Sequence, residues 1–471
     1  MDSEPQSPAD QQFLAAEYKV ELHSAGLKKE LRLVDLVGIQ ILNTMGFAWV
    51  GTAGKLGSSH LMFWILGVTL FYIPSGIVVA HLATQMPLEG GLYQWAKLRF
   101  SPLVGFLVAM NIWIANLLLV SRAGVVTADN TSYALGPGSA WISTSRLAII
   151  GLSVCVVAGV TLIGWRGLAL GKWVNNFGGF AIVFLFAAMI AVAFPHWFNG
   201  TVAIAPVAFT FPPVSLFSLN ILGKLGYGAL AGFDAVGVFA GECRSEDASG
   251  PIRRSVWLAA PLISGLFILG TACVLVFSKP ETIDLVSPMT QVLNLGAPRL
   301  ATPSALLLVA ALLAQTALGF SVMVRLPMVA GWDHLLPRWF SRLDPRFGTP
   351  VGSVLFAGVV GVVFAILANL GTGNQEAFQL LDNASGILYA LAYLAMFAIP
   401  LVARGDKPFW GVRVAALSGF LMTLLYVVLS VFPIIDLRNP GLFTAKIVTT
   451  VCVLQALGAA FYWRATRRTR V

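Results

Sequence analysis

Two long apolar stretches of the chain are interrupted by residues that could expose backbone groups to a bound solute. The first stretch, Leu33 to Leu56, contains Asn43-Thr44-Met45-Gly46 near its middle. A later stretch contains three glycines and an acid, Gly226, Gly228, Gly232 and Asp234. A break in a helix frees C=O groups at the end of its first half and N–H groups at the start of its second half, and lipid cannot hydrogen-bond to either. Paired interrupted helices are typical of proteins that carry solutes across membranes, so this pattern favours solute transport.

The amino-acid composition indicates the class of protein to which the chain belongs. The chain has 471 residues, 57% of them hydrophobic and 11% charged, and its mean hydropathy is +0.81. Soluble domains have roughly 25% charged residues. The sequence therefore predicts a polytopic membrane protein, and the net charge of +9 is expected to reflect membrane topology rather than nucleic-acid binding.

Runs of about 20 mainly apolar residues, the length that crosses a bilayer as a helix, predict twelve spans. They begin near residues 34, 62, 103, 147, 176, 221, 255, 302, 351, 377, 411 and 443. With both termini on one side, most of the 30 Lys and Arg residues fall on that side. By the positive-inside rule we expect both termini in the cytoplasm, and the protein as a multi-pass component of the plasma (inner) membrane.

The order of the spans predicts four parts. Residues 1–30 form a cytoplasmic N-terminal tail, residues 31–200 a first five-span repeat, residues 201–405 a second repeat, and residues 406–471 two accessory spans with a basic cytoplasmic tail. Because five is odd, spans one and six run in opposite directions. The predicted fold is an all-α membrane protein with a 5+5 inverted repeat, two accessory helices, and spans 1 and 6 broken.

Several of these segments are similar to motifs of one known family. The run Asn43-Thr44-Met45-Gly46-Phe47-Ala48 resembles a first-span motif in which a glycine-small-glycine triplet opens the helix. Further matches are Pro87-Leu88-Glu89-Gly90-Gly91, Gly232-Phe233-Asp234, Gly241-Glu242-Cys243 and Leu335-Leu336-Pro337. These motifs resemble those of the amino acid-polyamine-organocation (APC) superfamily, amino acid permease type. The resemblance implies the LeuT-like fold of sodium-coupled amino-acid transporters and transport by alternating access.

For the site, the resemblance implies that the broken spans hold an amino acid or a related amine. Its carboxylate would lie on the backbone of Gly46, Phe47 and Ala48, with Thr44 and Met45 beside it. Its ammonium would face carbonyls near Gly228, Ala229, Leu230 and Ala231, followed by Gly232. The sequence departs from the family pattern at Phe47 and Ala48, where a small residue and a second glycine are usual. A close helix crossing is the alternative role of Gly46.

Polar residues on two other spans are further candidates. Asn111 and Asn116 stand on span three, where Trp113 and Asn116 share one helix face and are similar to the family's third span. That resemblance implies that Asn116 faces the substrate, and an interhelical hydrogen bond is its alternative role. In span ten, Asp382 and Asn383 are expected either to form a gate or pocket wall or to join a buried structural network.

Two acids in or after span six have different expected roles. Asp234 lies within an apolar helix, where a carboxylate must pair, become neutral or move with a cation. It either handles protons or binds an amine, or it accepts hydrogen bonds from the unwound backbone and stabilises it. Glu242 lies nearer the cytoplasmic end and is predicted to pair with Arg253 or Arg254 as a structural lock.

The energy source for transport stays open at this point. Some members of the family have a lysine in span five in place of a sodium ion, but the similar segment 174–182 has none and Lys172 is the nearest. Proton coupling, sodium coupling, exchange against a counter-substrate and uniport are all compatible with the sequence. A partner subunit is neither indicated nor excluded.

Other classes of protein fit the sequence less well. The five histidines are not at metal-ligand spacing, and no nucleotide-binding glycine loop is present, so we expect no metal site, no cofactor and no enzymatic activity. Four scattered cysteines are interpreted as packing residues.

An exchanger of polyamines or other organocations is the main alternative function, and a channel-like facilitator is the alternative from another class. The expected partners are a small-molecule substrate and the lipid bilayer, and not a nucleic acid.

Overall fold

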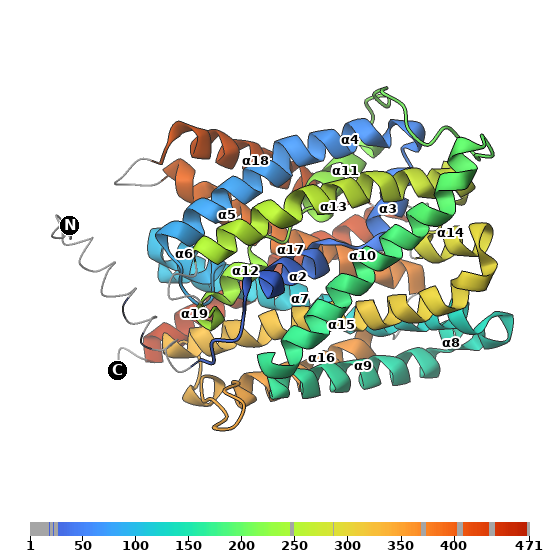
Figure 1. Cartoon of the computed structure of the whole chain (residues 1–471). Helices are drawn as coiled ribbons and strands as arrows, with labels where there is room; N and C mark the ends of the chain where they lie inside the picture. The colour runs from blue at the N-terminus through green and yellow to red at the C-terminus, as the bar shows by residue number, and fades with distance from the viewer. Residues whose placement is uncertain are drawn as a thin grey trace.

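The computed structural model describes residues 18, 22, 27–244, 249–285, 287–368, 374–402, 408–432 and 439–468. Within these ranges the chain is helical, and β-pairing is limited to two isolated bridges, Leu31 with Cys243 and Leu343 with Pro350. Most helices run roughly along one long axis of the molecule (Figure 1). The prediction of an all-α protein is confirmed for the described residues.

The elements follow one another as α2 (Leu33–Thr44), α3 (Phe47–Gly54), η1 (Gly57–Ser59), α4 (His60–Gly67), η2 (Val68–Tyr72), α5 (Ile73–Gln85), α6 (Leu92–Arg99), α7 (Pro102–Leu135), η3 (Pro137–Ser139), α8 (Trp141–Thr144), α9 (Arg146–Arg166), α10 (Leu168–Phe198), α11 (Leu216–Gly223), η4 (Lys224–Gly228), α12 (Ala235–Val238), η5 (Ala240–Glu242), α13 (Ser249–Phe277), η6 (Pro280–Thr282), α14 (Pro288–Gly296), α15 (Pro298–Trp332), η7 (Arg338–Phe340), α16 (Val351–Ala368), α17 (Asn374–Val402), α18 (Trp410–Leu429) and α19 (Pro440–Arg468).

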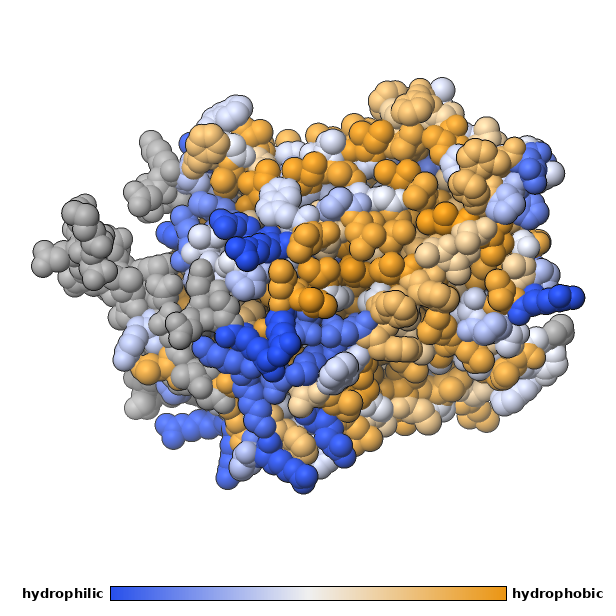
Figure 2. Space-filling model, in the orientation of Figure 1, coloured by the Kyte–Doolittle hydropathy of each residue, from blue (hydrophilic) through white to orange (hydrophobic). Residues whose placement is uncertain are grey.

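Nine helical stretches among the described residues are long and apolar enough to cross a membrane: Gly57–Gln85, Pro102–Leu135, Arg146–Arg166, Leu168–Phe198, Ser249–Phe277, Pro298–Gly331, Leu380–Val402, Trp410–Leu429 and Pro440–Arg467. The pair α2 and α3, bent by 44° at its break, is a tenth candidate. Hydrophobic side chains cover most of the face seen in Figure 2, and hydrophilic ones gather toward the end where α6 and α12 lie. The chain is therefore a multi-pass membrane protein.

The expected count of twelve spans stays a prediction. The apolar stretch Val351–Leu367 is shorter than a usual membrane-spanning helix. In the region of the predicted span six, α11 has 8 residues and α12 has 4, because an irregular segment separates them. These two regions account for the difference between the expected count and the ten candidates.

The first interruption separates α2 from α3. Met45 (φ −82°, ψ 108°) and Gly46 (φ −121°, ψ 129°) are extended, and α3 starts again at Phe47. The N–H of Met45 still donates to the carbonyl of Ile41 at 2.9 Å, so α2 is regular up to the break. As at any helix start, the first N–H groups of α3 have no carbonyl one turn earlier to receive them.

The second interruption lies between η4 and α12. η4 is a π-helical turn in which the N–H of Ala229 donates to the carbonyl of Lys224 at 2.8 Å. Gly232 has φ 151°, and a Cβ there would lie 2.7 Å from the side chains of both Asn43 and Thr44, so only glycine fits. The side-chain amide of Asn43 donates to the carbonyl of Gly232 at 3.3 Å. The two interruptions therefore contact each other.

Long helices surround the interruptions. α7 packs along both α15 and α17, and α15 also packs against α2. Ser101 caps the start of α7, because its hydroxyl accepts a hydrogen bond from the N–H of Val104, and Pro102 is the first helical residue. Gly136, with φ 85°, follows the last helical residue. This local start and stop fixes which 34 residues form the helix and so places its polar residues beside the breaks.

Candidate binding site

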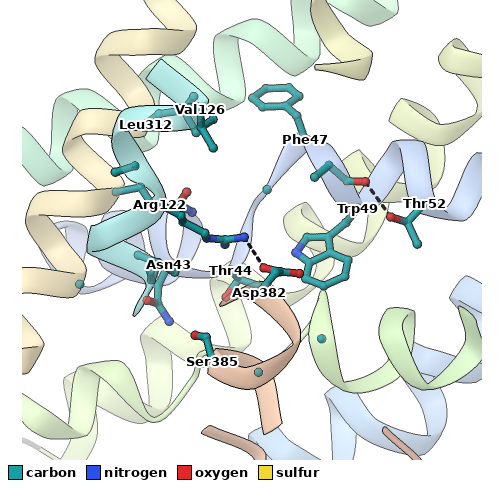
Figure 3. A pocket seen from close by; sticks show the side chains of 18 of the residues that line it. Asn43, Thr44, Phe47, Trp49, Thr52, Arg122, Val126, Leu312, Asp382 and Ser385 are labelled. Carbon is teal, nitrogen blue, oxygen red and sulfur yellow. Dashed lines mark hydrogen bonds and ion pairs between the residues drawn. The ribbon is translucent and has the colours of Figure 1, made fainter. Parts of the chain in front are cut away.

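A cavity of about 720 Å³ lies between the two interruptions and the three surrounding helices. Figure 3 shows part of its wall, with Phe47 and Trp49 of α3 facing the space next to polar side chains of α7 and α17. Its lining residues come from α2 and α3, from α7, from η4 and the segment after it, from residues 283–285, and from α15, α17 and α18. The cavity therefore lies where the free backbone groups of the first interruption are expected.

The structure brings nine of the predicted site residues to the cavity wall: Thr44, Gly46, Phe47, Ala48, Asn116, Gly228, Ala231, Asp382 and Asn383. Asn116 also donates to the carbonyl of Ile112 in its own helix at 2.8 Å. Its predicted place beside a ligand and its own hydrogen bond are therefore compatible.

The other predicted site residues are not among those that line the cavity: Met45, Asn111, Ala229, Leu230, Gly232 and Asp234. Asn111 is buried and accepts a hydrogen bond from the amide of Gln455 in α19 at 2.5 Å. Five residues of helix rotate a side chain by about 140°. Asn111 therefore faces away from the cavity that Asn116 faces, and it forms a contact between α7 and α19.

An ion pair crosses the cavity from α7 to α17. The guanidinium of Arg122 donates to the carboxylate of Asp382, and both side chains are about one quarter exposed, at 21% and 27% (Figure 3). The two residues are 260 positions apart in the chain. The pair ties the two helices together at the level of the first interruption.

The carbonyl groups freed at the end of α2 receive a donor from α15. The side-chain amide of Gln315 donates to the carbonyl of Leu42 at 2.7 Å and to that of Met45 at 3.4 Å. Gln315 also lines the cavity. The first interruption is therefore stabilised by a neutral side chain from another helix.

Asp234 stabilises the second interruption through two tyrosines. Tyr389 donates to its carboxylate at 2.6 and 2.8 Å, and Tyr393 donates to it at 2.5 Å. The hydroxyl of Tyr393 also accepts the N–H of Gly232 at 2.8 Å. Of the two roles left open by the sequence, these contacts favour the stabilising one, because the carboxylate is linked to the irregular backbone through Tyr393.

The end of the molecule near the start of α2 is closed by buried charges. The guanidinium of Arg325 donates to both carboxylate oxygens of Glu242 at 2.8 Å, and Glu89 lies 3.8 Å from it. The prediction that Glu242 pairs with Arg253 or Arg254 is wrong, because these two side chains are exposed at the start of α13 whereas Glu242 is buried.

Contacts of the segment before α2 continue this closed end. The N–H groups of Glu30 and Leu31 donate to the carbonyl of Glu242 at 2.9 and 3.0 Å. The Lys172 ammonium donates to the Glu30 carboxylate at 2.5 Å and lowers the pKa of that carboxyl below its ordinary value of 4.5. The segment before α2 is thus fastened to η5 and to α10.

The opposite end of the cavity reaches the surface. Tyr133 near the end of α7 lines the cavity and is 43% exposed, and its hydroxyl donates to Asp284 at 2.9 Å. Lys55, after α3, and Asp129 of α7 also line this end. The cavity is therefore accessible from one end of the molecule and closed at the other.

A comparison with known families decides the class to which this arrangement belongs. A family model described as amino acid permease matches residues 31–456. The chain belongs to the amino acid permease family. The resemblance seen in the sequence motifs is thereby confirmed.

The permease is similar to several known proteins. It is 25% identical over 389 residues to an uncharacterized transporter of Legionella pneumophila, covering 81% of the permease and 82% of that protein. It is 24% identical over 351 residues to the probable agmatine/putrescine antiporter AguD of Lactococcus lactis, covering 73% and 72%. It is 20% identical over 455 residues to the aspartate/glutamate permease AcaP of the same species, covering 89% and 92%. These relatives are transporters, which supports a non-enzymatic role.

Among solved structures, the permease is similar to MhsT, which was crystallised in complex with L-phenylalanine. The TM-score is 0.59 at 15% sequence identity, and the match covers 85% of the permease and 98% of that chain. At this identity the likeness shows the fold alone, which is the LeuT fold.

Several residues of the permease's site were missed at the sequence level. Gln315 and Lys224 both line the cavity, and Arg325 forms the closed end. Each is a polar residue within or at the edge of an apolar stretch, which is the signal that could have identified them. Their partners are 83 to 273 positions away in the chain, and that distance hides the pairing from a single sequence.

Proposed function

We propose that this permease moves an amino acid or a related amine across the membrane as a secondary active transporter, by alternating access. The observation that carries the proposal is that the two interruptions contact each other through Asn43 and Gly232, and that both contribute to one cavity. Free backbone groups from two helices thus lie within reach of one small molecule.

The chemistry of the cavity suits a zwitterion. The start of α3 offers N–H groups of Phe47 and Ala48, and a helix start favours a carboxylate. Gly228 and Ala231 of the second interruption also line the cavity, and carbonyl groups of an irregular segment can accept hydrogen bonds from an ammonium. We therefore propose that the substrate's carboxylate binds at the first interruption and its ammonium at the second.

The finer topology is part of the proposal. We assign twelve spans, with α2–α3 as broken span 1 and the region from α11 to α12 as broken span 6, in a 5+5 inverted repeat with α18 and α19 as accessory helices. The bent α2–α3 pair and the likeness to the LeuT fold support this assignment. The distribution of Lys and Arg supports cytoplasmic termini and a location in the plasma membrane.

In this topology the structure corresponds to one state of the transport cycle. The closed end, with Arg325 and Glu242, would face the cytoplasm, and the accessible end near Tyr133 would face outside. Transport then requires the Arg325 contacts to open when the outer end closes. The coupling ion or counter-substrate would act by shifting the equilibrium between the state with the outer end open and the state with the Arg325 end open.

Counterflow in proteoliposomes tests the proposal. Gly46→Leu places an isobutyl group at the start of α3, where even a Cβ would lie 3.2 Å from the indole of Trp49, and it should abolish counterflow of every amino acid that the wild type carries. Gly151→Leu on the exposed face of α9 is the matched control, because no atom lies within 4 Å of a Cβ there. Wild-type counterflow by a folded Gly46→Leu protein would overturn the site. Failure of the folded wild type to exchange any amino acid or amine would overturn the function.

A further inference from the structure

A buried lysine forms part of the cavity wall, and the described residues give it no carboxylate within 4 Å. Lys224 is the first residue of η4, lines the cavity and is only 4% exposed. Its ammonium donates to the side-chain oxygen of Asn383 at 2.9 Å and lies 5.9 Å from the ring centre of Tyr426. An ammonium has three N–H donors, and an amide oxygen and a ring face balance its charge only in part.

The acid next to the partner of Lys224 is already engaged. Asp382, next to Asn383 in α17, pairs with Arg122. Among the residues that the structure describes, the ion pairs within 4 Å do not include Lys224. Asp129 lines the accessible end, seven residues and about 10 Å along α7 from Arg122. Among the described residues, Asp382 is thus paired with Arg122, and Lys224 has no carboxylate within 4 Å.

A buried cation is costly unless an anion balances it, and in a binding cavity the anion can come from the ligand. Resting on the proposed function, we infer that the substrate is an amino acid with a second carboxylate, and that this carboxylate pairs with Lys224. The same lysine excludes polyamines and other organocations, because their charges would meet an unbalanced ammonium.

The positions of the three binding groups suit one small molecule. A Cβ on Gly228, one turn after Lys224, would lie 2.8 Å from the indole of Trp49, so η4 contacts the first turn of α3. The start of α3 is where the α-carboxylate is placed in the proposed function. A dicarboxylic amino acid can therefore span from α3 to Lys224 while its ammonium faces the carbonyls between them.

The experiment compares four proteins in proteoliposomes: wild type, Lys224→Met, Lys224→Arg and Lys279→Met. The last is the matched control, because Lys279 is exposed and outside the cavity. Counterflow is measured with L-glutamate and L-aspartate, with their neutral analogues L-glutamine and L-asparagine, and with putrescine. Thermal stabilisation by each compound reports binding independently of transport.

We expect wild type and Lys279→Met to prefer a dicarboxylate over its amide analogue. Lys224→Met should weaken the apparent affinity for the dicarboxylate by about 10- to 100-fold, the range for a lost charged hydrogen bond. Lys224→Met should leave the apparent affinity for the amide analogue nearly unchanged. Lys224→Arg should keep the preference for the dicarboxylate over its amide. If Lys224→Met does not fold, stabilisation of the wild type by glutamate over glutamine still decides the question.

Two results would overturn the inference. One is wild-type exchange of neutral or cationic amino acids with no response to dicarboxylates, which would leave the transport proposal intact. The other is a dicarboxylate preference that a folded Lys224→Met protein retains. An absence of exchange and of stabilisation with all five compounds and with a wider amino-acid panel would instead count against the proposed function.

Discussion

The side-chain amide of Gln315 lies 2.7 Å from the carbonyl oxygen of Leu42, and it joins α15 to the last turn of α2. The break after Thr44 frees this carbonyl, and a donor from another helix satisfies it. The shape of the first interruption thus depends on a residue 273 positions later in the chain.

Gln315→Leu should destabilise the protein and impair transport. It removes the donor to two buried carbonyls, and each unsatisfied group costs about 1–3 kcal/mol. The thermal midpoint in detergent and the rate of amino-acid exchange should both fall. Ser264→Ala on α13, which loses only a hydrogen bond to Ala260 within its own helix, should leave both near wild type. Equal effects of the two changes would contradict the role of Gln315.

Arg325→Gln should loosen the closed end. The change removes the charge that holds Glu242, and loss of about 1.4 kcal/mol would raise the open population roughly tenfold. Cys243 is buried next to Glu242, so its labelling by N-ethylmaleimide in a protein that lacks the other three cysteines, Cys155, Cys273 and Cys452, reports opening. We expect faster labelling than in wild type.

Arg338→Gln provides the comparison for the labelling experiment, because Arg338 is exposed and outside the buried cluster. Its labelling rate should match that of wild type. Protection of Cys243 that is the same in Arg325→Gln and in wild type would show that Arg325 does not hold this end closed.

Asp234→Asn should lower stability and leave the pH profile of transport unchanged. Two tyrosines donate to this carboxylate, and hydrogen bonds to charged groups contribute about 1.5–3 kcal/mol each. Tyr393→Phe should reproduce part of the loss, because it removes one of these bonds and the acceptor for the N–H of Gly232. A flattened pH profile in Asp234→Asn would instead assign proton handling to Asp234.

The contact between Glu30 and Lys172 should contribute pH-dependent stability. The lowered pKa of Glu30 means that its carboxylate stays charged in the folded protein at a pH where the same carboxyl is already protonated in the unfolded chain. The contribution, at most about 1 kcal/mol for a partly exposed pair, should be full above pH 4.5 and be lost as the pH falls through the lowered pKa. The difference in thermal midpoint between wild type and Glu30→Gln should therefore shrink as the pH is lowered.

The sequence predicted the first interruption because glycine and polar residues are conspicuous in an apolar stretch. Gly46, Phe47 and Ala48 lie on the wall of the cavity, whereas Met45 does not. Asn111 contacts α19 and does not line the cavity, and the position of a residue on span three does not say which neighbouring helix its face meets.

Lys224 shows why the rest of the site could not be predicted. At the start of the second broken stretch, a lysine is indistinguishable from a residue that marks the membrane boundary. Its burial follows from packing against α17 and α18, through Asn383 and Tyr426. Likewise Glu242 had two arginines nearby in sequence, and the structure pairs it with Arg325, 83 residues away.

The contact of Asn43 with Gly232, 189 residues apart, also bears on how the protein is made. A chain emerging from the ribosome at about 5–20 residues per second completes the first half of the site long before Asp382 and Asn383 are synthesised. During that interval of tens of seconds, the free backbone groups of the first interruption are covered only in part, because the second interruption and α15 are synthesised one after the other and α17 follows last. The site is therefore a late product of biosynthesis, and we expect fragments that end before α17 to be recognised as unassembled by the quality control of the cell.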